Sequence, residues 1–442
     1  MSAPAGSDDA DPETVFASLP PPDAFQKDAG WSRDWSRVWA PHEEKLAATR
    51  HLQGEELMNA FRSRPDHVSP DGKGRVLFFD VTGGATVRLA KERARCEQIA
   101  RETQVARDAR NACEQERKSQ ANLPEVTKIQ NMPMSMLQNG ETIPLVGLGT
   151  WKSTEKGEAQ RAVDHALNAG YTHIDCASVY ENEKEIGDGL QNVFQSTRLN
   201  RGDIFLTSKL WNDKHHPNDV EAACRATLSD LRTDYLDLYL MHWPVVTGNT
   251  GDVVDPSIES TWKAMERLVD LGLVRSLGVS NFSVTKLEKI KKIARYPLQV
   301  CQVECHPYHR NDVLSAYCSD NGIHVTAYSP LGSPDSASMF RGREKVPELL
   351  KDNCIGEIAA RNGKNVGQVL IKWALQKRPT SSVLPKSANP DRLKGNLELF
   401  DWNLSDEDVK TIDQIETRAR MVDGSFWLSA NGPYRKLEDL WD

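Results

Sequence analysis

Leu236-Asp-Leu-Tyr-Leu-Met-His242 is the stretch that decides the fold class, because a largely apolar run of strand length ends in a histidine. A near-continuous apolar run indicates a strand that is buried on both faces, as in a parallel sheet covered by helices. The run Ile204–Lys209 has the same form and ends in a lysine, and Thr172–Cys176 carries an aspartate near its end. Together these runs predict a parallel α/β protein.

Eight runs of this kind follow one another along the C-terminal part of the chain, and helical patterns such as Glu158–Asn168, Ile258–Leu271 and Val366–Lys377 separate them. Eight βα units in about 310 residues predict a (β/α)8 TIM barrel over residues 126–442. The alternative is a doubly wound sheet, but Gly147-Leu-Gly149 lacks the third glycine of that fold's nucleotide-binding turn. The predicted strands are Ile143–Leu148, Thr172–Cys176, Ile204–Lys209, Leu236–His242, Val274–Ser280, Gln299–Glu304, His324–Tyr328 and Ser381–Pro385.

Polar residues recur at one end of these predicted strands. Packing alone does not explain them, because a parallel strand that is buried on both faces should be apolar throughout. Barrel enzymes collect their catalytic groups at the carboxyl ends of the strands. The polar residues at these ends are Asp175, Lys209, His242, Ser280, Asn281, Gln302, Glu304, Tyr328 and, just after the eighth strand, Lys386.

Asp175, Lys209 and His242 combine with Tyr180 into a set that suits proton transfer to a carbonyl oxygen. The pKa of a tyrosine is about 10, which is high for a proton donor at neutral pH. The cation of Lys209 would lower that pKa, and Asp175 would keep the lysine charged and in place. His242 can donate a hydrogen bond that orients the carbonyl. Each residue alone is more often ordinary packing, but four such groups at three consecutive strand ends favour catalysis.

From Val126 to Asp442 the chain resembles the aldo-keto reductase superfamily, and its ending, GSFWLSANGPYRKLEDLWD (424–442), is most similar to the aldose-reductase-like branch. The resemblance implies that Tyr180 is the catalytic acid, with Asp175, Lys209 and His242 as the rest of the tetrad. One matching stretch alone would only be suggestive, but together they are highly specific. The stretches are LQNGETIPLVGLGTW (137–151), HIDCASVYENEKEIG (173–187), LTSKLW (206–211), DYLDLYLMHWP (234–244), GVSNF (278–282), QVECHPY (302–308), AYSPLGS (327–333) and LPKSANPDRLKGN (384–396).

The resemblance also implies that NADP(H) is the cofactor. The chemistry of the residues agrees, because a 2′-phosphate favours cations and Lys386 and Arg392 are six residues apart across a strand-to-helix turn. Gly395 replaces the usual Glu or Gln and predicts a looser hold on the adenine. The implied contacts are Thr150 and Trp151 at the nicotinamide, Ser280, Asn281 and Gln302 at its carboxamide, Tyr328 stacked on its ring, Ser329, Leu331 and Ser333 along the pyrophosphate, Lys386, Ser387 and Arg392 at the 2′-phosphate, and Asn396 at the adenine.

Tryptophans adjoin several of these motif positions and predict an aromatic substrate pocket around His242. Trp151 follows Thr150, Trp211 follows Leu210 and Trp243 follows His242, whereas core tryptophans have no reason to neighbour motif residues. An apolar, aromatic wall suits aldehydes with hydrophobic bodies. The predicted substrate-binding residues are Trp151, Trp211, His242, Trp243 and Trp427.

Composition excludes several other classes of protein. The chain has 442 residues, a net charge of −8 and 39% hydrophobic residues, so we expect no nucleic-acid partner. No window approaches the roughly 20 apolar residues of a membrane-spanning helix, and the acidic N-terminus lacks the features of a signal or transit peptide. The eight cysteines contain no CxxC pair, which argues against a disulfide framework or a metal site. We therefore predict a cytoplasmic protein with no membrane contact.

Residues 1–125 differ in character from the barrel and form a predicted N-terminal extension. A flexible arm is followed by Trp31, Trp35 and Trp39, whose spacing places them along one side of a helix. Runs at 75–80 and 85–89 flank a Gly-Gly pair and indicate a hairpin. A long helix is predicted over residues 90–119, where 14 of the 28 residues from Lys91 to Lys118 are charged. The tryptophans could pack on this chain's own barrel or dock onto a protein partner.

We predict an NADPH-dependent reductase that converts aldehydes, with aldoses and ketones as further candidates, to alcohols by hydride transfer and a proton from Tyr180. A second hypothesis is that the barrel serves as a structural subunit of a larger assembly, attached through residues 1–125. A third, the potassium-channel β-subunit role known in the superfamily, is weaker because residues 424–442 resemble the reductase branch.

Overall fold

The computed structural model describes residues 132–442, apart from residues 335–346 and 379. The predicted tryptophan-bearing helix, hairpin and charged helix of residues 1–125 lie outside the described residues, and so does the predicted domain boundary at 125. These features therefore stay predictions of the sequence.

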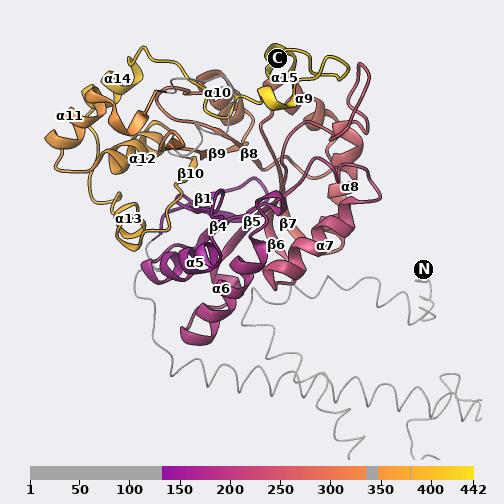
Figure 1. Ribbon diagram of the computed structural model, residues 1–442, viewed down its shortest axis with the longest axis horizontal. Helices are drawn as coiled ribbons and strands as arrows, with labels where there is room; N and C mark the ends of the chain where they lie inside the picture. Colours follow the sequence, from indigo (N-terminus) through magenta and orange to yellow (C-terminus); the bar gives the residue numbers. More distant parts are fainter. Residues whose placement is uncertain (1–131, 335–346, 379) are drawn as a thin grey trace, which may run out of the picture. The chain divides into compact units, whose positions relative to one another are not determined.

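The described chain forms the predicted (β/α)8 barrel, in which eight parallel strands pair in chain order (Figure 1). The first and last strands meet through a parallel bridge between Val146 and Val383, where the Gly147 amide donates to the Val383 carbonyl at 2.9 Å. This contact closes the ring. The strands are β3 (Leu148–Gly149), β4 (His173–Asp175), β5 (Phe205–Leu210), β6 (Leu236–Met241), β7 (Val274–Ser280), β8 (Val300–Glu304), β9 (His324–Tyr328) and β10 (Ser382–Leu384).

Helices follow the strands and surround the barrel, as the sequence predicts (Figure 1). The three helices predicted by residue range are confirmed to within one residue at their ends. Local signals explain where several begin: Asn365 caps α12 in a capping box with Gln368, and Asn389 caps α13 directly before Pro390. The helices are α5 (Glu158–Ala169), α6 (Glu183–Ser196), α7 (Val220–Leu231), α8 (Ile258–Asp270), α9 (Val284–Ile293), α10 (Asp312–Asp320), α11 (Asn353–Arg361), α12 (Val366–Lys377), α13 (Pro390–Gly395), α14 (Asp406–Asp413) and α15 (Leu437–Trp441).

The predicted first strand, Ile143–Leu148, is wrong in its extent. Its first two residues, Ile143 and Pro144, belong to β2 (Thr142–Pro144), which pairs antiparallel with β1 (Met134–Met136) in a separate hairpin. The turn contains Asn139-Gly140, with Gly140 at φ 84°, and this is a strong hairpin signal. The Asn139 side chain donates to the Ser276 hydroxyl at 2.9 Å, so the turn lies at the amino-terminal end of β7.

The hairpin covers the amino-terminal end of the barrel interior. Leu137 and Ile143 form one buried cluster with Phe205, Leu238 and Val300, which lie at or near the starts of barrel strands. Apolar contact at this end leaves the opposite end of the barrel for polar groups. The amino-terminal, lower end of the barrel is therefore packed with apolar side chains, and the polar groups lie at the carboxyl, upper end, where the site forms.

Alternation along the strands decides which side chains face the interior. In β6, Leu238 and Leu240 belong to the interior cluster, whereas Tyr239 and Met241 belong to the core between the sheet and the helices. His242 follows Leu240 by two residues and therefore points inward at the carboxyl end. The same period of two places Lys209 of β5 in the interior.

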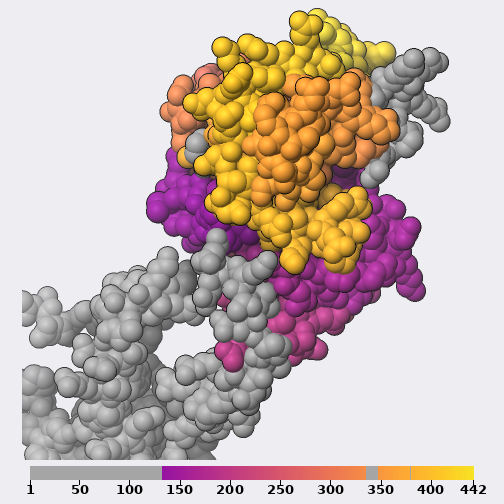
Figure 2. Space-filling view, turned by 90° about the vertical axis from the view of Figure 1, so that its left-hand side faces the viewer, coloured from indigo at the N-terminus to yellow at the C-terminus, as the bar shows by residue number. Residues whose placement is uncertain are grey.

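The C-terminal part of the chain lies directly on the N-terminal part of the barrel. In Figure 2 the orange and yellow surface of the C-terminal segments covers the violet surface of the first βα units. Helix α13 packs against α5, and the Tyr171 hydroxyl just after α5 donates to the Leu393 carbonyl of α13 at 3.2 Å. Residues that are distant in sequence thus come together beside the first and last strands.

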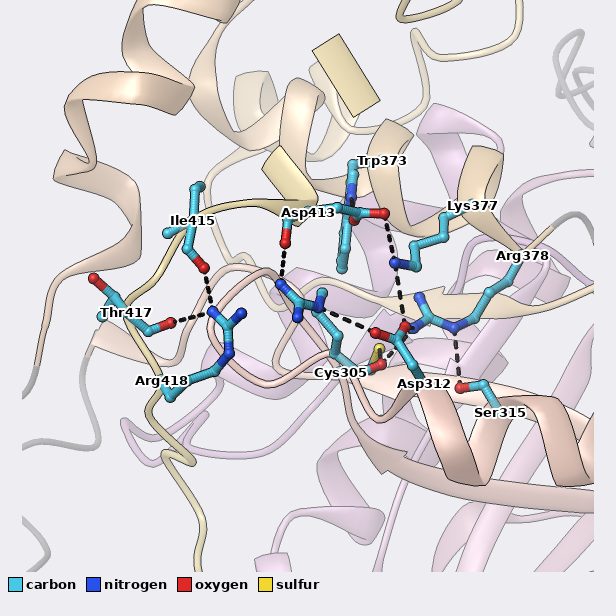
Figure 3. A network of polar contacts seen from close by, with 11 residues as sticks. Cys305, Asp312, Ser315, Trp373, Lys377, Arg378, Asp413, Ile415, Thr417 and Arg418 are labelled. Carbon is cyan, nitrogen blue, oxygen red and sulfur yellow. Dashed lines mark hydrogen bonds and ion pairs between the residues drawn. The ribbon is translucent and has the colours of Figure 1, made fainter. Parts of the chain in front are cut away.

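A polar network fastens the chain that follows α14 to the barrel (Figure 3). The Asp413 carboxylate accepts hydrogen bonds from Trp373 Nε1 at 2.9 Å and from Lys377 Nζ at 2.7 Å, both on α12. Arg378, at the end of α12, donates to Asp312 of α10 at 3.1 Å. The network fixes where the C-terminal segment begins its path toward the upper end of the barrel.

Substitution of Gly187 by Ala is expected to destabilise the barrel, because α6 and α7 are in close contact there. A Cβ atom at Gly187 would lie 2.3 Å from the Asp230 carbonyl oxygen, so the backbone of one helix must shift. We expect a loss of about 1–3 kcal/mol in the free energy of unfolding, measured by urea denaturation. Gly356→Ala in α11 is the control, because its Cβ meets no atom within 4 Å, and it should stabilise by about 0.5–1 kcal/mol. Equal effects of the two substitutions would contradict this account.

Candidate active site

A cavity of about 710 Å³ opens at the carboxyl ends of the barrel strands. Most of the residues predicted for the site line it, although they come from every part of the barrel. They are Thr150, Trp151, Asp175, Tyr180, Trp211, His242, Trp243, Ser280, Asn281, Gln302, Tyr328, Ser329, Leu331, Ser333, Lys386, Ser387 and Arg392.

Lys209 lies beneath the floor of this cavity and connects the acidic and phenolic members of the predicted tetrad. Its ammonium donates to Asp175 Oδ1 at 2.5 Å, to the Cys176 carbonyl at 2.8 Å and to the Tyr180 hydroxyl at 3.4 Å. The second oxygen of Asp175 accepts a hydrogen bond from Gln302 Nε2 at 2.6 Å. The lysine is fully buried, so its charge depends on these partners.

The ionisation of Lys209 and Tyr180 follows from this arrangement. Burial is the largest single influence and acts to lower the pKa of Lys209, but the Asp175 carboxylate and Tyr180 together outweigh it and raise that pKa to about 12. Burial raises the pKa of Tyr180 to about 12, while the lysine cation acts to lower it. The lysine therefore acts in the expected direction, but burial is the larger effect. At neutral pH the phenol keeps its proton beside a charged ammonium.

His242 faces the Tyr180 side of the cavity as a neutral ring. Burial holds the pKa of His242 well below its ordinary value, and the Lys209 cation lowers it further. The imidazole stacks edge-on with Tyr180 at 5.8 Å and with Trp211 at 5.0 Å between ring centroids. A neutral imidazole has one N–H to donate, which suits it to orient an uncharged carbonyl oxygen.

Hydrogen bonds within the protein already orient the residues predicted to hold a carboxamide. Asn281 Nδ2 donates to the His242 carbonyl at 3.0 Å and to the Ser280 hydroxyl at 3.1 Å. Asn281 Oδ1 accepts from the Tyr328 hydroxyl at 2.7 Å. Asn281 has a φ of 64°, a conformation in which Asn is favoured over most residues. The ends of β6, β7 and β9 are thereby linked into one wall.

At another part of the cavity lie Lys386, Ser387 and Arg392, at and beyond the end of β10. Asn389 caps α13 between them and accepts a hydrogen bond from the Arg392 amide at 2.9 Å. Lys386 Nζ forms an ion pair with Glu158 Oε1 of α5 at 3.1 Å. Glu158 is not among the residues that the sequence predicts for the site. The sequence places Glu158 at the start of a predicted helix, but it does not show that this residue lies near Lys386.

Three predicted residues do not line the cavity. Lys209 lies below it, as described above. Asn396 is the C-terminal cap of α13 and is buried. Trp427 packs behind the wall, with ring centroids 5.6 Å from Trp211 and 6.1 Å from Trp243, whereas the cavity is lined by its neighbour Phe426.

Glu304 occupies a strand end but serves the C-terminal segment instead of the cavity. Its buried carboxylate accepts hydrogen bonds from the Met421 amide at 2.5 Å, the Val422 amide at 2.7 Å and His306 Nε2 at 2.8 Å. Burial acts to raise the pKa of this carboxyl, but the hydrogen bonds from His306 and Met421 lower it overall. Glu304 thus anchors the chain from which Val422 and Phe426 enter the cavity wall.

The sequence model described as "Aldo/keto reductase family" matches residues 145–417. This chain belongs to the aldo/keto reductase family. It is 45% identical over 325 residues to an aldo/keto reductase of Synechocystis sp., which covers 71% of this chain and 98% of that protein. It is 44% identical over 300 residues to aldo-keto reductase family 1 member A1 of Mus musculus, with 65% of this chain and 90% of that protein covered.

Solved structures of aldo/keto reductases share the barrel. The aldose reductase of Schistosoma japonicum matches with a TM-score of 0.59 and 38% identity, covering 69% of this chain and 99% of that one. An aldo-keto reductase of Bombyx mori, solved in complex with NADP, matches with a TM-score of 0.62 and 34% identity over the same shares. The family and fold that the sequence motifs predicted are confirmed.

Among residues 132–334, 347–378 and 380–442, no three His, Cys, Asp or Glu side chains are grouped so that they could hold a metal ion. In the same part of this reductase-family chain, every helix is too short or too polar to cross a bilayer.

The buried ion pair predicts strong coupling between Asp175 and Lys209 in stability. Asp175→Asn or Lys209→Met alone leaves one buried charge without its partner and should cost about 3–5 kcal/mol in the free energy of unfolding. The double variant removes both charges and should cost clearly less than the sum, measured by urea denaturation of all three variants.

The exposed pair Arg225–Glu221 is the control, because its side chains are 53% and 41% exposed. Glu221→Gln should change the free energy of unfolding by less than about 1 kcal/mol. Strictly additive costs at Asp175 and Lys209 would show that the buried pair is not coupled.

Proposed function

We propose that this chain reduces aldehydes, with aldoses and ketones as further candidates, to alcohols with NADPH as the hydride donor. The observation that carries the proposal is the contact of Lys209 with both Asp175 and Tyr180, beside a neutral His242, at the floor of one large cavity. Membership of the aldo/keto reductase family and the NADP complex of the Bombyx mori relative support it.

The residues around the cavity fit a nicotinamide dinucleotide phosphate by their chemistry. Ser280, Asn281 and Gln302 offer amide and hydroxyl groups for a carboxamide, and Tyr328 offers an aromatic ring. Lys386 and Arg392 offer two cations for a phosphate, which Arg can hold with a bidentate fork. When bound, the reduced nicotinamide supplies a hydride to the carbonyl carbon of the substrate.

The protein's own residues act on the carbonyl oxygen. Tyr180 holds a proton at neutral pH and donates it to that oxygen as negative charge develops there. Lys209 stabilises the phenolate that remains, since its ammonium lies 3.4 Å from the Tyr180 oxygen. Asp175 keeps the lysine in place, and the neutral imidazole of His242 orients the oxygen by a hydrogen bond. Water entering from solvent can later return the proton.

The cavity wall favours substrates with an apolar body. Trp151, Trp211, Trp243 and Phe426 line it beside the predicted proton donor. Large aromatic side chains bind varied hydrophobic shapes without directional contacts. The names of the relatives, an aldose reductase and a family 1 member A1, point to aldehydes and sugars as the first substrates to test.

The structural-subunit hypothesis rests on residues 1–125, which lie outside the described residues. It stays a prediction, as does cytoplasmic location. The catalytic proposal stands on the described barrel alone.

Tyr180→Phe is expected to lower the rate of aldehyde reduction by at least about 100-fold, because the proton donor is lost. Binding of NADPH should change by less than about twofold, since only a hydroxyl is removed. Turnover is followed by the absorbance of NADPH and binding by fluorescence titration. Tyr317→Phe on α10, remote from the cavity, is the control and should leave both unchanged. Turnover retained in Tyr180→Phe would refute the proposed role.

The raised pKa of Tyr180, about 12, predicts different pH dependences for the two reaction directions. Reduction uses the phenol, which stays fully protonated below that pKa, so its maximal rate should be flat between about pH 6 and 9. Oxidation of the alcohol uses the phenolate, whose fraction rises about tenfold per pH unit below the pKa. Because its pKa is lowered well below the ordinary value, His242 stays neutral across this pH range and does not contribute to the pH dependence of either rate. A bell-shaped reduction profile centred near neutral pH would contradict this assignment.

A further inference from the structure

The cationic part of the cavity contains a carboxylate that the proposed cofactor contacts do not use. Glu158 is the first residue of α5, its side chain is 16% exposed, and it lines the same cavity as Lys386 and Arg392. Its Oε1 lies 3.1 Å from Lys386 Nζ. The two residues are 228 positions apart in the chain. The packing of α13 against α5 brings their two regions together.

Among the described residues that line the cavity, the acidic ones are Glu158 and Asp175. Asp175 is bound to Lys209 and Gln302 and its charge is balanced in the barrel interior. Glu158 instead pairs with a lysine that is 31% exposed and able to change partners. The charge of Glu158 therefore acts on whatever occupies the part of the cavity beside Lys386.

The two nicotinamide dinucleotides differ at one position of the adenosine ribose. One carries a phosphate there, which two cations attract and a neighbouring carboxylate repels. The other carries a free hydroxyl there. This hydroxyl can donate a hydrogen bond to a carboxylate, as it does to the acidic residue of NAD-binding folds. Lys386 cannot serve the phosphate fully while it remains paired with Glu158, because the two anions compete for one ammonium.

We propose that Glu158 sets the cofactor selectivity of this cavity: its carboxylate competes for Lys386, weakens the preference for NADPH, and makes the cavity accept NADH as well. The inference rests on the proposed function, in which Lys386 and Arg392 hold the 2′-phosphate. In addition, the carboxylate of Glu158 at the start of α5 weakens the binding of that phosphate.

The test measures the dissociation constants of NADPH and NADH by isothermal titration calorimetry with the full chain. Glu158→Gln should tighten NADPH binding about five- to tenfold, because it removes one charge 3.1 Å from the ammonium of Lys386, the proposed phosphate-binding cation. Tenfold corresponds to about 1.4 kcal/mol. NADH should bind equally well or more weakly. The dissociation constant of NADH divided by that of NADPH should therefore rise at least about fivefold.

Glu259→Gln is the matched control, because Glu259 is also an acid in the first turn of a barrel helix, α8, but does not line the cavity. It should leave both constants unchanged. A ratio in Glu158→Gln that stays within about twofold of the original value, or that falls, overturns the inference. A fall would mean that the carboxylate positions Lys386 for the phosphate.

Lys386→Met separates failure of this inference from failure of the proposed function. If Lys386 holds the 2′-phosphate, this neutral variant should bind NADPH at least about tenfold more weakly and NADH unchanged. Unchanged NADPH binding in Lys386→Met would refute the phosphate site itself. Weakened NADPH binding there, together with an unchanged ratio in Glu158→Gln, would refute the role of Glu158 alone.

Discussion

The ion pair between Lys209 and Asp175 is the interaction on which the rest of the site depends. Both side chains are buried, at 0% and 5% exposure, so each charge is stabilised by the other and not by water. The pair holds an ammonium 3.4 Å from the Tyr180 hydroxyl, and Gln302 binds the remaining carboxylate oxygen. The proposed proton donation and the stability of the barrel's polar upper end therefore share one contact.

A second lysine–carboxylate pair in the same cavity has a different character. Lys386 and Glu158 are 31% and 16% exposed, so water and ligands can reach both charges. An exposed pair is weak and exchangeable, whereas a buried pair is lost only at great cost. The barrel thus combines a permanent ion pair beside the proposed proton donor with an exchangeable one beside the predicted phosphate contacts. Exposure, more than residue type, distinguishes their roles.

The barrel strands and the polar residues at their carboxyl ends were predictable because each depends on local pattern. The period of two along β5 and β6 decides that Lys209 and His242 face inward at the carboxyl ends. The first predicted strand is wrong in extent for a local reason too, since Asn139-Gly140 forms a hairpin turn and Ile143 pairs with β1 instead of extending β3. Trp427 was predicted at the cavity, but a short helical turn directs its neighbour Phe426 there.

By itself the sequence determined the barrel, the family and the polar strand ends, because apolar runs and strand ends are properties of short segments. Only the tertiary structure decided that Glu158 meets Lys386, 228 residues away, and that Glu304 anchors the Val422 amide, 118 residues away. It also decided that burial outweighs the lysine in setting the pKa of Tyr180. Such contacts and burial depend on the summed geometry of many strands, turns and helices, which no single segment encodes.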